Sequence, residues 1–94
     1  MARILVIDDE RSIRNAIKEI LEFEKYDVSL AADGIEGIAM IEQSDFDVIL
    51  CDVKMPGKDG FEVCETLKSD ELTDHIPIIL HTPNQILLHL NRHN

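Results

Sequence analysis

The chain has 94 residues, enough for one domain with a modest hydrophobic core. Its 19 acidic residues outnumber 9 lysines and arginines, and the net charge of −10 argues against binding to nucleic acid or to an anionic membrane. The same charge suits a protein that gathers divalent cations or meets a basic partner. The sequence shows no membrane-spanning run and no signal-peptide pattern, so we expect a cytoplasmic protein in which Cys51 and Cys64 are reduced core residues.

The chain begins with a strand-like segment followed by a helix-like one. Residues 3–7 are β-rich and almost wholly apolar, which predicts a strand that is covered on both faces. After an acidic triplet, apolar residues recur with the spacing of one helix face. This stripe consists of Ile13, Ala16, Ile17, Ile20 and Leu21. We expect Asp9 or Glu10 to cap the helix and to interact favourably with its positive end.

The alternation of strands and helices continues along the chain. The expected elements are a strand at 26–32, a short helix beginning near Gly34, a strand at 46–51, a helix at about 61–68 and a strand at 76–80. Gly37 lies inside the short helix and is expected to weaken it. Strands that alternate with helices of this length form βαβ units with right-handed crossovers around a parallel sheet. The predicted fold class is therefore α/β.

Carboxylates stand at the ends of two predicted strands. Asp8 and Asp9 follow the first strand, and Asp52 ends the third. In a parallel sheet the carboxyl ends of neighbouring strands meet at one edge, where a poorly solvated carboxylate needs a cation, hydrogen bonds or a proton. Mg²⁺ would suit such an oxygen-rich site and would let Asp52 attack a phosphoryl group. The alternative is an acidic rim left by helix capping and turns, and spacing alone does not separate the two hypotheses.

Four motifs follow one another in the chain: Ile4–Glu10, Asp47–Asp52, Met55–Gly57 and Asp59-Gly60. Together and in this order they resemble the receiver domains of bacterial two-component response regulators. The resemblance extends over residues 2–82. It implies a flavodoxin-like fold, with helices on both faces of a parallel sheet whose strand order is 2-1-3-4-5.

The resemblance also implies roles for individual residues. Asp52 would be the phospho-acceptor, charged by the phosphohistidine of a sensor kinase. Asp9 would bind Mg²⁺ directly and Asp8 through water, together with Asp52 and the backbone carbonyl of Lys54. Thr82 would be the switch hydroxyl that closes on the phosphoryl oxygen.

The chain departs from the family after Thr82. The family continues with a fourth helix, a fifth strand that ends in a lysine, and a fifth helix, whereas Lys68 is the last lysine here. Pro83 also stands where the family prefers a small residue. We therefore expect an incomplete receiver at 1–82 and a non-matching tail at 83–94, without the fifth strand and fifth helix. We expect metal binding to survive and phosphorylation to be weakened or lost.

Without a fifth strand, the fourth strand would form an apolar edge of the sheet. Such an edge templates pairing with another chain, which predicts a homodimer or swapped oligomer through this strand or the tail. The alternative is that the tail folds back over the edge as a short helix. His89 and His93 have a helical metal-ligand spacing, but they lack a third ligand nearby, so a polar terminal segment is favoured.

Three functional hypotheses remain. The leading one is a phospho-acceptor signalling module rather than an enzyme. The second is a truncated or engineered receiver fragment that self-associates without switching. The third is a Mg²⁺-dependent phosphohydrolase with an aspartate nucleophile. It is disfavoured because the sequence pattern of such enzymes has a second aspartate two residues after the nucleophile, and this chain has Lys54 at that position.

Overall fold

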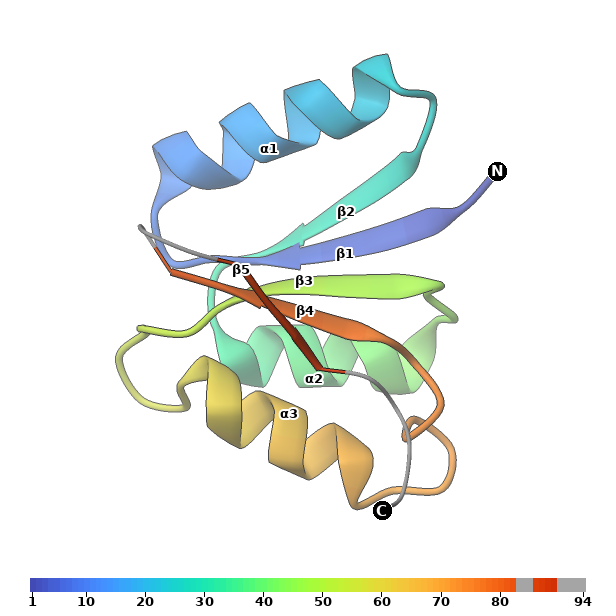
Figure 1. Ribbon diagram of the computed structural model, residues 1–94, viewed down its shortest axis with the longest axis vertical. Helices are drawn as coiled ribbons and strands as arrows, with labels where there is room; N and C mark the ends of the chain where they lie inside the picture. Colours follow the sequence, from blue (N-terminus) through green and yellow to red (C-terminus); the bar gives the residue numbers. More distant parts are fainter. Residues whose placement is uncertain (83–85, 90–94) are drawn as a thin grey trace.

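A parallel β-sheet forms the centre of the computed structural model, which describes residues 1–82 and the backbone of residues 86–89 (Figure 1). Its parallel strands are β1 Arg3–Ile7, β2 Asp27–Ala31, β3 Val48–Asp52 and β4 Ile78–His81. They lie in the order β2-β1-β3-β4. The predicted α/β fold with the flavodoxin-like strand order is confirmed for these strands.

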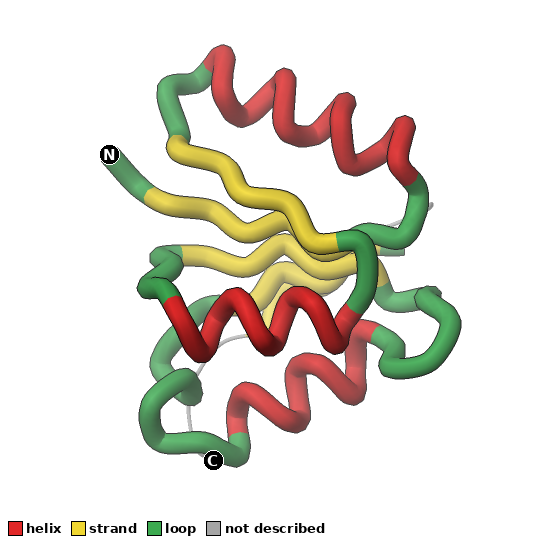
Figure 2. Tube along the Cα trace, turned by 180° about the vertical axis from the view of Figure 1, so that it is seen from behind, coloured by secondary structure: helices red, strands yellow, loops and turns green. Residues whose placement is uncertain are grey.

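The helices divide between the two faces of the sheet. Helix α1, Arg11–Phe23, lies on one face, and α2, Gly34–Gln43, and α3, Gly60–Lys68, lie on the other (Figure 2). None of the helices in the described part of the chain has the length and hydrophobicity of a membrane span.

The hydrophobic core has two parts because the side chains of each strand alternate between the faces. The larger part faces α2 and α3 and includes Leu5, Ile7, Ile49 and Ile78, all fully buried. The smaller part faces α1 and contains Ile4, Val6 and Val28. This alternation explains why β1 is apolar at successive positions: both of its faces are covered.

Gly37 has a packing role that the sequence prediction missed. A Cβ atom at this position would overlap Ile7 Cδ1 and lie 2.9 Å from Ile7 Cγ1. The glycine that costs α2 some intrinsic helix propensity therefore allows the helix to lie close against β1.

A further strand, β5 Ile86–His89, pairs antiparallel with β4. The prediction that the fourth strand is a bare edge is therefore wrong, and so is the alternative in which a helix covers it. The open side of β4 presents backbone N–H and C=O groups, and a nearby extended segment can pair with them directly. Because β5 is antiparallel, it is not the parallel fifth strand of the receiver fold, and the described elements do not include that strand or a fifth helix.

Candidate functional site

Asp8 follows β1 directly and is 1% exposed. Its backbone N–H donates to the carbonyl of Ala31, and its Oδ1 accepts a 2.9 Å hydrogen bond from the backbone N–H of Glu10. The Arg14 guanidinium donates to the backbone carbonyl of Asp8 at 2.8 Å. The hydrogen bond to Oδ1 orients the carboxylate, and the other two contacts hold the backbone of Asp8 in place.

Asp52 is the last residue of β3, which lies between β1 and β4. Because Ile7 pairs with Cys51, the next residues along the two strands, Asp8 and Asp52, emerge side by side. The following loop returns closely to the strand, since the N–H of Gly60 donates to the carbonyl of Val53 at 2.9 Å. A Cβ atom at Gly60 would overlap the Asp52 carbonyl oxygen, so this glycine allows the close approach.

His81 completes the cluster, and the sequence prediction missed it. It is the last residue of β4 and pairs with Asp52 in the sheet register. One ligand atom from each of Asp8, Asp52 and His81 lies within 4.8 Å of the others. The rule that located the two aspartates, polar residues at the carboxyl ends of parallel strands, also applies to His81. The sequence analysis did not apply this rule to the fourth strand.

The electrostatic environment of the pocket disfavours the ionised form of the Asp52 side chain. Burial raises the pKa of Asp52, and the negative charges of Asp8 and, more weakly, Asp9 raise it further. His81 and a hydrogen bond to the Lys54 backbone act in the opposite direction on this pKa. Two carboxylates that repel each other in a partly buried pocket are stabilised by a cation between them.

The other predicted site residues lie around this pocket. Asp9 is exposed, and its charge reaches Asp52, but among the described side chains it does not belong to the compact ligand cluster. Lys54 has an exposed side chain in the loop after β3, and Thr82 is half-buried directly after His81. The roles of Asp9, Lys54 and Thr82 remain predictions.

The donor set of the pocket suits a divalent metal ion. Asp8 and Asp52 supply carboxylate oxygens, which are the ligands that Mg²⁺ prefers. The side chains of His89 and His93, the alternative metal pair, lie outside the described part of the chain.

Cys51 lies beside the site but is not a candidate nucleophile. Burial, followed by the charges of Asp52 and Asp8, raises the pKa of its thiol to about 12. A thiol with this pKa holds very little thiolate at neutral pH and is therefore inert. Cys51 and Cys64 are both free and buried, as the sequence predicted.

Comparison with known proteins agrees with this arrangement. Residues 4–89 match the response regulator receiver domain family. The chain belongs to this family. The acidic pocket of this receiver chain lies at the carboxyl ends of the parallel strands, where the positions of Asp8 and Asp52 after two predicted strands had indicated it.

Similar proteins include full-length regulators much longer than this receiver. The response regulator PleD of Caulobacter vibrioides is 48% identical over 81 residues, which are 86% of this chain and 18% of PleD. The DNA-binding dual master transcriptional regulator RpaA of Synechocystis is 44% identical over 82 residues, which are 87% of this chain and 34% of RpaA. This receiver thus spans well under half of either relative.

Solved receiver structures superpose on most of the chain. Chemotaxis protein CheY4 of Vibrio cholerae aligns with a TM-score of 0.82 and 35% identity, over 89% of this chain and 73% of CheY4. Response regulator TrrA of Thermotoga maritima, solved in complex with Mg²⁺-BeF, aligns with a TM-score of 0.82 and 36% identity. That alignment covers 87% of this chain and 70% of TrrA.

Proposed function

We propose that this chain is the phospho-acceptor module of a two-component system, in which Asp52 is phosphorylated by a sensor histidine kinase in the presence of Mg²⁺. The observation that supports this most directly is the convergence of Asp8 and Asp52 at the ends of adjacent strands in a chain of the receiver family. The relative TrrA was solved with Mg²⁺-BeF, which is consistent with the same chemistry here.

The pocket residues would divide the work of phosphoryl transfer. A Mg²⁺ ion held by Asp8, Asp9, Asp52 and the Lys54 carbonyl would neutralise charge on the incoming phosphoryl oxygens. A carboxylate oxygen of Asp52 attacks phosphorus, the P–N bond of the phosphohistidine breaks, and an acyl phosphate forms on Asp52. The Thr82 hydroxyl would then move to donate a hydrogen bond to a phosphoryl oxygen.

We further propose that phosphorylation of this chain is slow. Among the described side chains, His81 is the one whose charge lowers the pKa of Asp52, and no lysine or arginine side chain acts on this pKa. Lys68, the last lysine in the sequence, does not serve this pocket. Its ammonium donates to the carbonyls of Asp74 and Ile76. These residues precede β4 and lie at the amino ends of the parallel strands, whereas the pocket lies at the carboxyl ends.

The test is to incubate the chain with Mg²⁺ and acetyl phosphate and to measure its intact mass. We expect a gain of one phosphoryl group that develops slowly, depends on Mg²⁺, and is absent in Asp52→Asn. Asp47→Asn, which changes a carboxylate at the other end of β3, is the matched control and should be phosphorylated normally. No gain at saturating phosphodonor would contradict the proposal and favour a fragment that keeps the fold without the switch. Continuous release of phosphate over many turnovers would favour a phosphohydrolase.

Self-association remains a second proposal, but we now propose that it involves the edge strand β5 rather than β4. With β4 paired on both sides, β2 and β5 are the edge strands of the described sheet, and the proposed contact with a second copy uses the edge of β5. Multi-angle light scattering over a range of concentrations should show a dimer, and a monomer at every concentration would contradict this proposal.

A further inference from the structure

We propose that His81 makes the acidic pocket a binding site for a transition-metal ion such as Co²⁺ or Zn²⁺. The ligands would be carboxylate oxygens of Asp8 and Asp52 and the Nε2 atom of His81. This inference depends on the proposed role of the two aspartates as metal ligands and adds a nitrogen ligand from β4.

The first argument is the state of the His81 ring. Its Nε2 atom is buried and has no hydrogen-bond partner among the described residues. It lies 3.5 Å from Asp8 Oδ2, close enough for a charge interaction but not aligned as a hydrogen bond. Buried polar atoms are rarely left without a partner, and one that points at a carboxylate pair is placed to bind a ligand.

The second argument is the distance between the ligand atoms. Zinc binds histidine nitrogen and carboxylate oxygen at about 2.0–2.2 Å, so two such ligands on a tetrahedral ion are about 3.3–3.6 Å apart. The 3.5 Å between His81 Nε2 and Asp8 Oδ2 falls within this range, whereas it is too long for a good hydrogen bond. Asp52 is half-buried, and its ligand atom is already within 4.8 Å of the other two. In the proposed site, the Asp52 side chain moves to bring this oxygen into the same coordination sphere.

The third argument is that the surrounding backbone holds two of the three ligands. The Glu10 N–H occupies Oδ1 of Asp8 and thereby leaves Oδ2 on the side of His81. The Val53 N–H donates to the His81 carbonyl at 3.0 Å, which anchors the end of β4 beside β3. Ligands oriented by such neighbouring hydrogen bonds need little rearrangement to bind a metal.

The nature of the third ligand determines which ion the pocket prefers. Mg²⁺ favours oxygen ligands and gains little from an imidazole. Imidazole suits Co²⁺, Zn²⁺ and other first-row transition ions, whose affinities also rise along the Irving–Williams series. The pocket should therefore bind Co²⁺ more tightly than Mg²⁺, with His81 responsible for much of the difference. Three protein ligands leave at least one position on the ion for water or a phosphoryl oxygen.

The test is a titration of the whole chain with Co²⁺, followed by visible absorption spectroscopy and calorimetry. We expect the intense absorption of a four- or five-coordinate Co²⁺ site, removed by excess Zn²⁺. His81→Gln should weaken Co²⁺ binding about tenfold or more and reduce this absorption, and it should change Mg²⁺ affinity by a much smaller factor. Asp8→Asn should weaken the binding of both ions.

Two control variants separate this site from the other histidines of the chain. His75→Gln changes an exposed histidine before β4, and the double variant of His89→Gln with His93→Gln changes the terminal pair. Both should bind Co²⁺ as the unmodified chain does. Unchanged Co²⁺ affinity in His81→Gln, or a loss confined to the double variant, would overturn the inference.

The outcome can be distinguished from that of the proposed function. Mg²⁺-dependent phosphorylation of Asp52 is measured on the same preparations. If phosphorylation fails while Co²⁺ binds through His81, the phospho-acceptor proposal fails and the metal site stands. If phosphorylation succeeds while His81→Gln leaves Co²⁺ binding unchanged, the reverse holds.

Discussion

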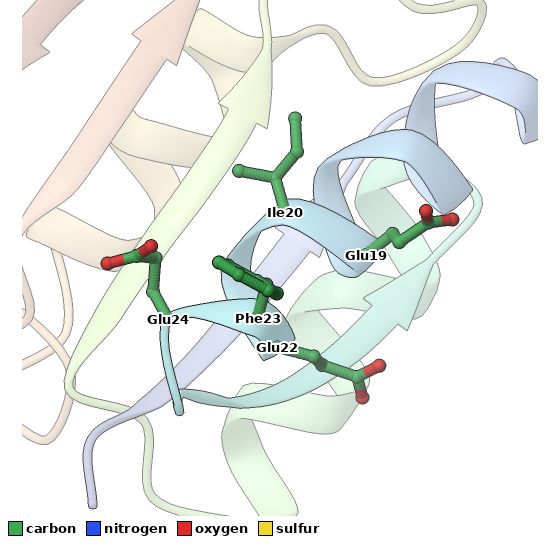
Figure 3. Close-up of a pocket in the computed structure, with 5 residues that line it drawn as sticks. All are labelled: Glu19, Ile20, Glu22, Phe23 and Glu24. Carbon is green, nitrogen blue, oxygen red and sulfur yellow. The ribbon is translucent and has the colours of Figure 1, made fainter.

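The two faces of the sheet are covered very differently. On the face of α2 and α3, helix residues such as Val63 and Leu67 of α3 are buried. On the other face, α1 has no residue in the buried class within the described part of the chain, and Ile20 and Phe23 are 64% and 81% exposed. These two side chains line a groove with Glu19, Glu22 and Glu24 (Figure 3). Most of the packing stability should therefore come from the α2–α3 face.

The helices on the two faces also differ in the hydrogen bonds that cap their ends. Helix α3 begins with a capping box, in which Asp59 and Glu62 each accept a hydrogen bond from the other's backbone N–H. Helix α1 has Glu10 as its N-cap residue but no side-chain cap hydrogen bond from the described residues, although the sequence predicted a cap from Asp9 or Glu10. At its other end, the C-cap Glu24 is followed by Lys25, a non-glycine residue in the left-handed region at φ 74°. The local interactions thus also favour the α2–α3 side.

The largest expected effect comes from removing a buried side chain on the α2–α3 face. Ile49→Ala should lower the free energy of unfolding by about 2–5 kcal/mol, because the fully buried side chain leaves a cavity between β3 and the helices. Urea unfolding followed by circular dichroism measures this change. A loss well under this range would mean that the α2–α3 face does not dominate stability.

A smaller loss is expected from Gly60→Ala at the start of α3. The added Cβ would lie 2.8 Å from Val53 Cα and would overlap the Asp52 carbonyl, which should cost about 1–3 kcal/mol. It should also slow phosphorylation of Asp52, because the end of β3 must shift. Gly57→Ala is the matched control: its Cβ meets no described atom within 4 Å, so only its positive φ costs energy, about 1 kcal/mol. Equal effects of both variants would argue against the close contact.

A substitution at Lys25, just after α1, should increase the stability of the chain. The backbone N–H of Tyr26 donates to the Leu21 carbonyl across this residue, which is the pattern of a helix end that glycine usually occupies. Lys25→Gly should therefore raise the free energy of unfolding by about 0.5–1 kcal/mol. Ala16→Gly, within the same helix, should instead lower it by about 1 kcal/mol. If Lys25→Gly destabilises the chain, the left-handed conformation at this residue is contradicted.

The smallest effect is expected from Phe23→Ala. Because most of this ring is exposed, its loss should change the free energy of unfolding by no more than about 0.5 kcal/mol. Phe46→Ala removes the same side chain from a site that is 6% exposed and should cost about 3–5 kcal/mol. Similar losses for the two variants would show that the α1 face is covered in solution.

The sequence alone determined the order of elements from β1 to β4 and two of the three residues in the pocket. The apolar runs and the helical stripe specify strands and helices locally, because the side chains that become buried recur along the chain with the short period of a strand or a helix. Asp8 and Asp52 were found because each follows such a run directly, and parallel strands bring their carboxyl ends to one edge.

Only the tertiary structure decided the place of His81 and the pairing of β5. Whether a side chain at the end of a strand reaches its neighbours depends on the strand order, the register and the face to which it points. The roles of Gly37 and Gly60 likewise depend on how closely a helix or loop approaches a strand that is distant in the sequence. Such contacts arise from the packing of distant segments, which no local repeat in the sequence encodes.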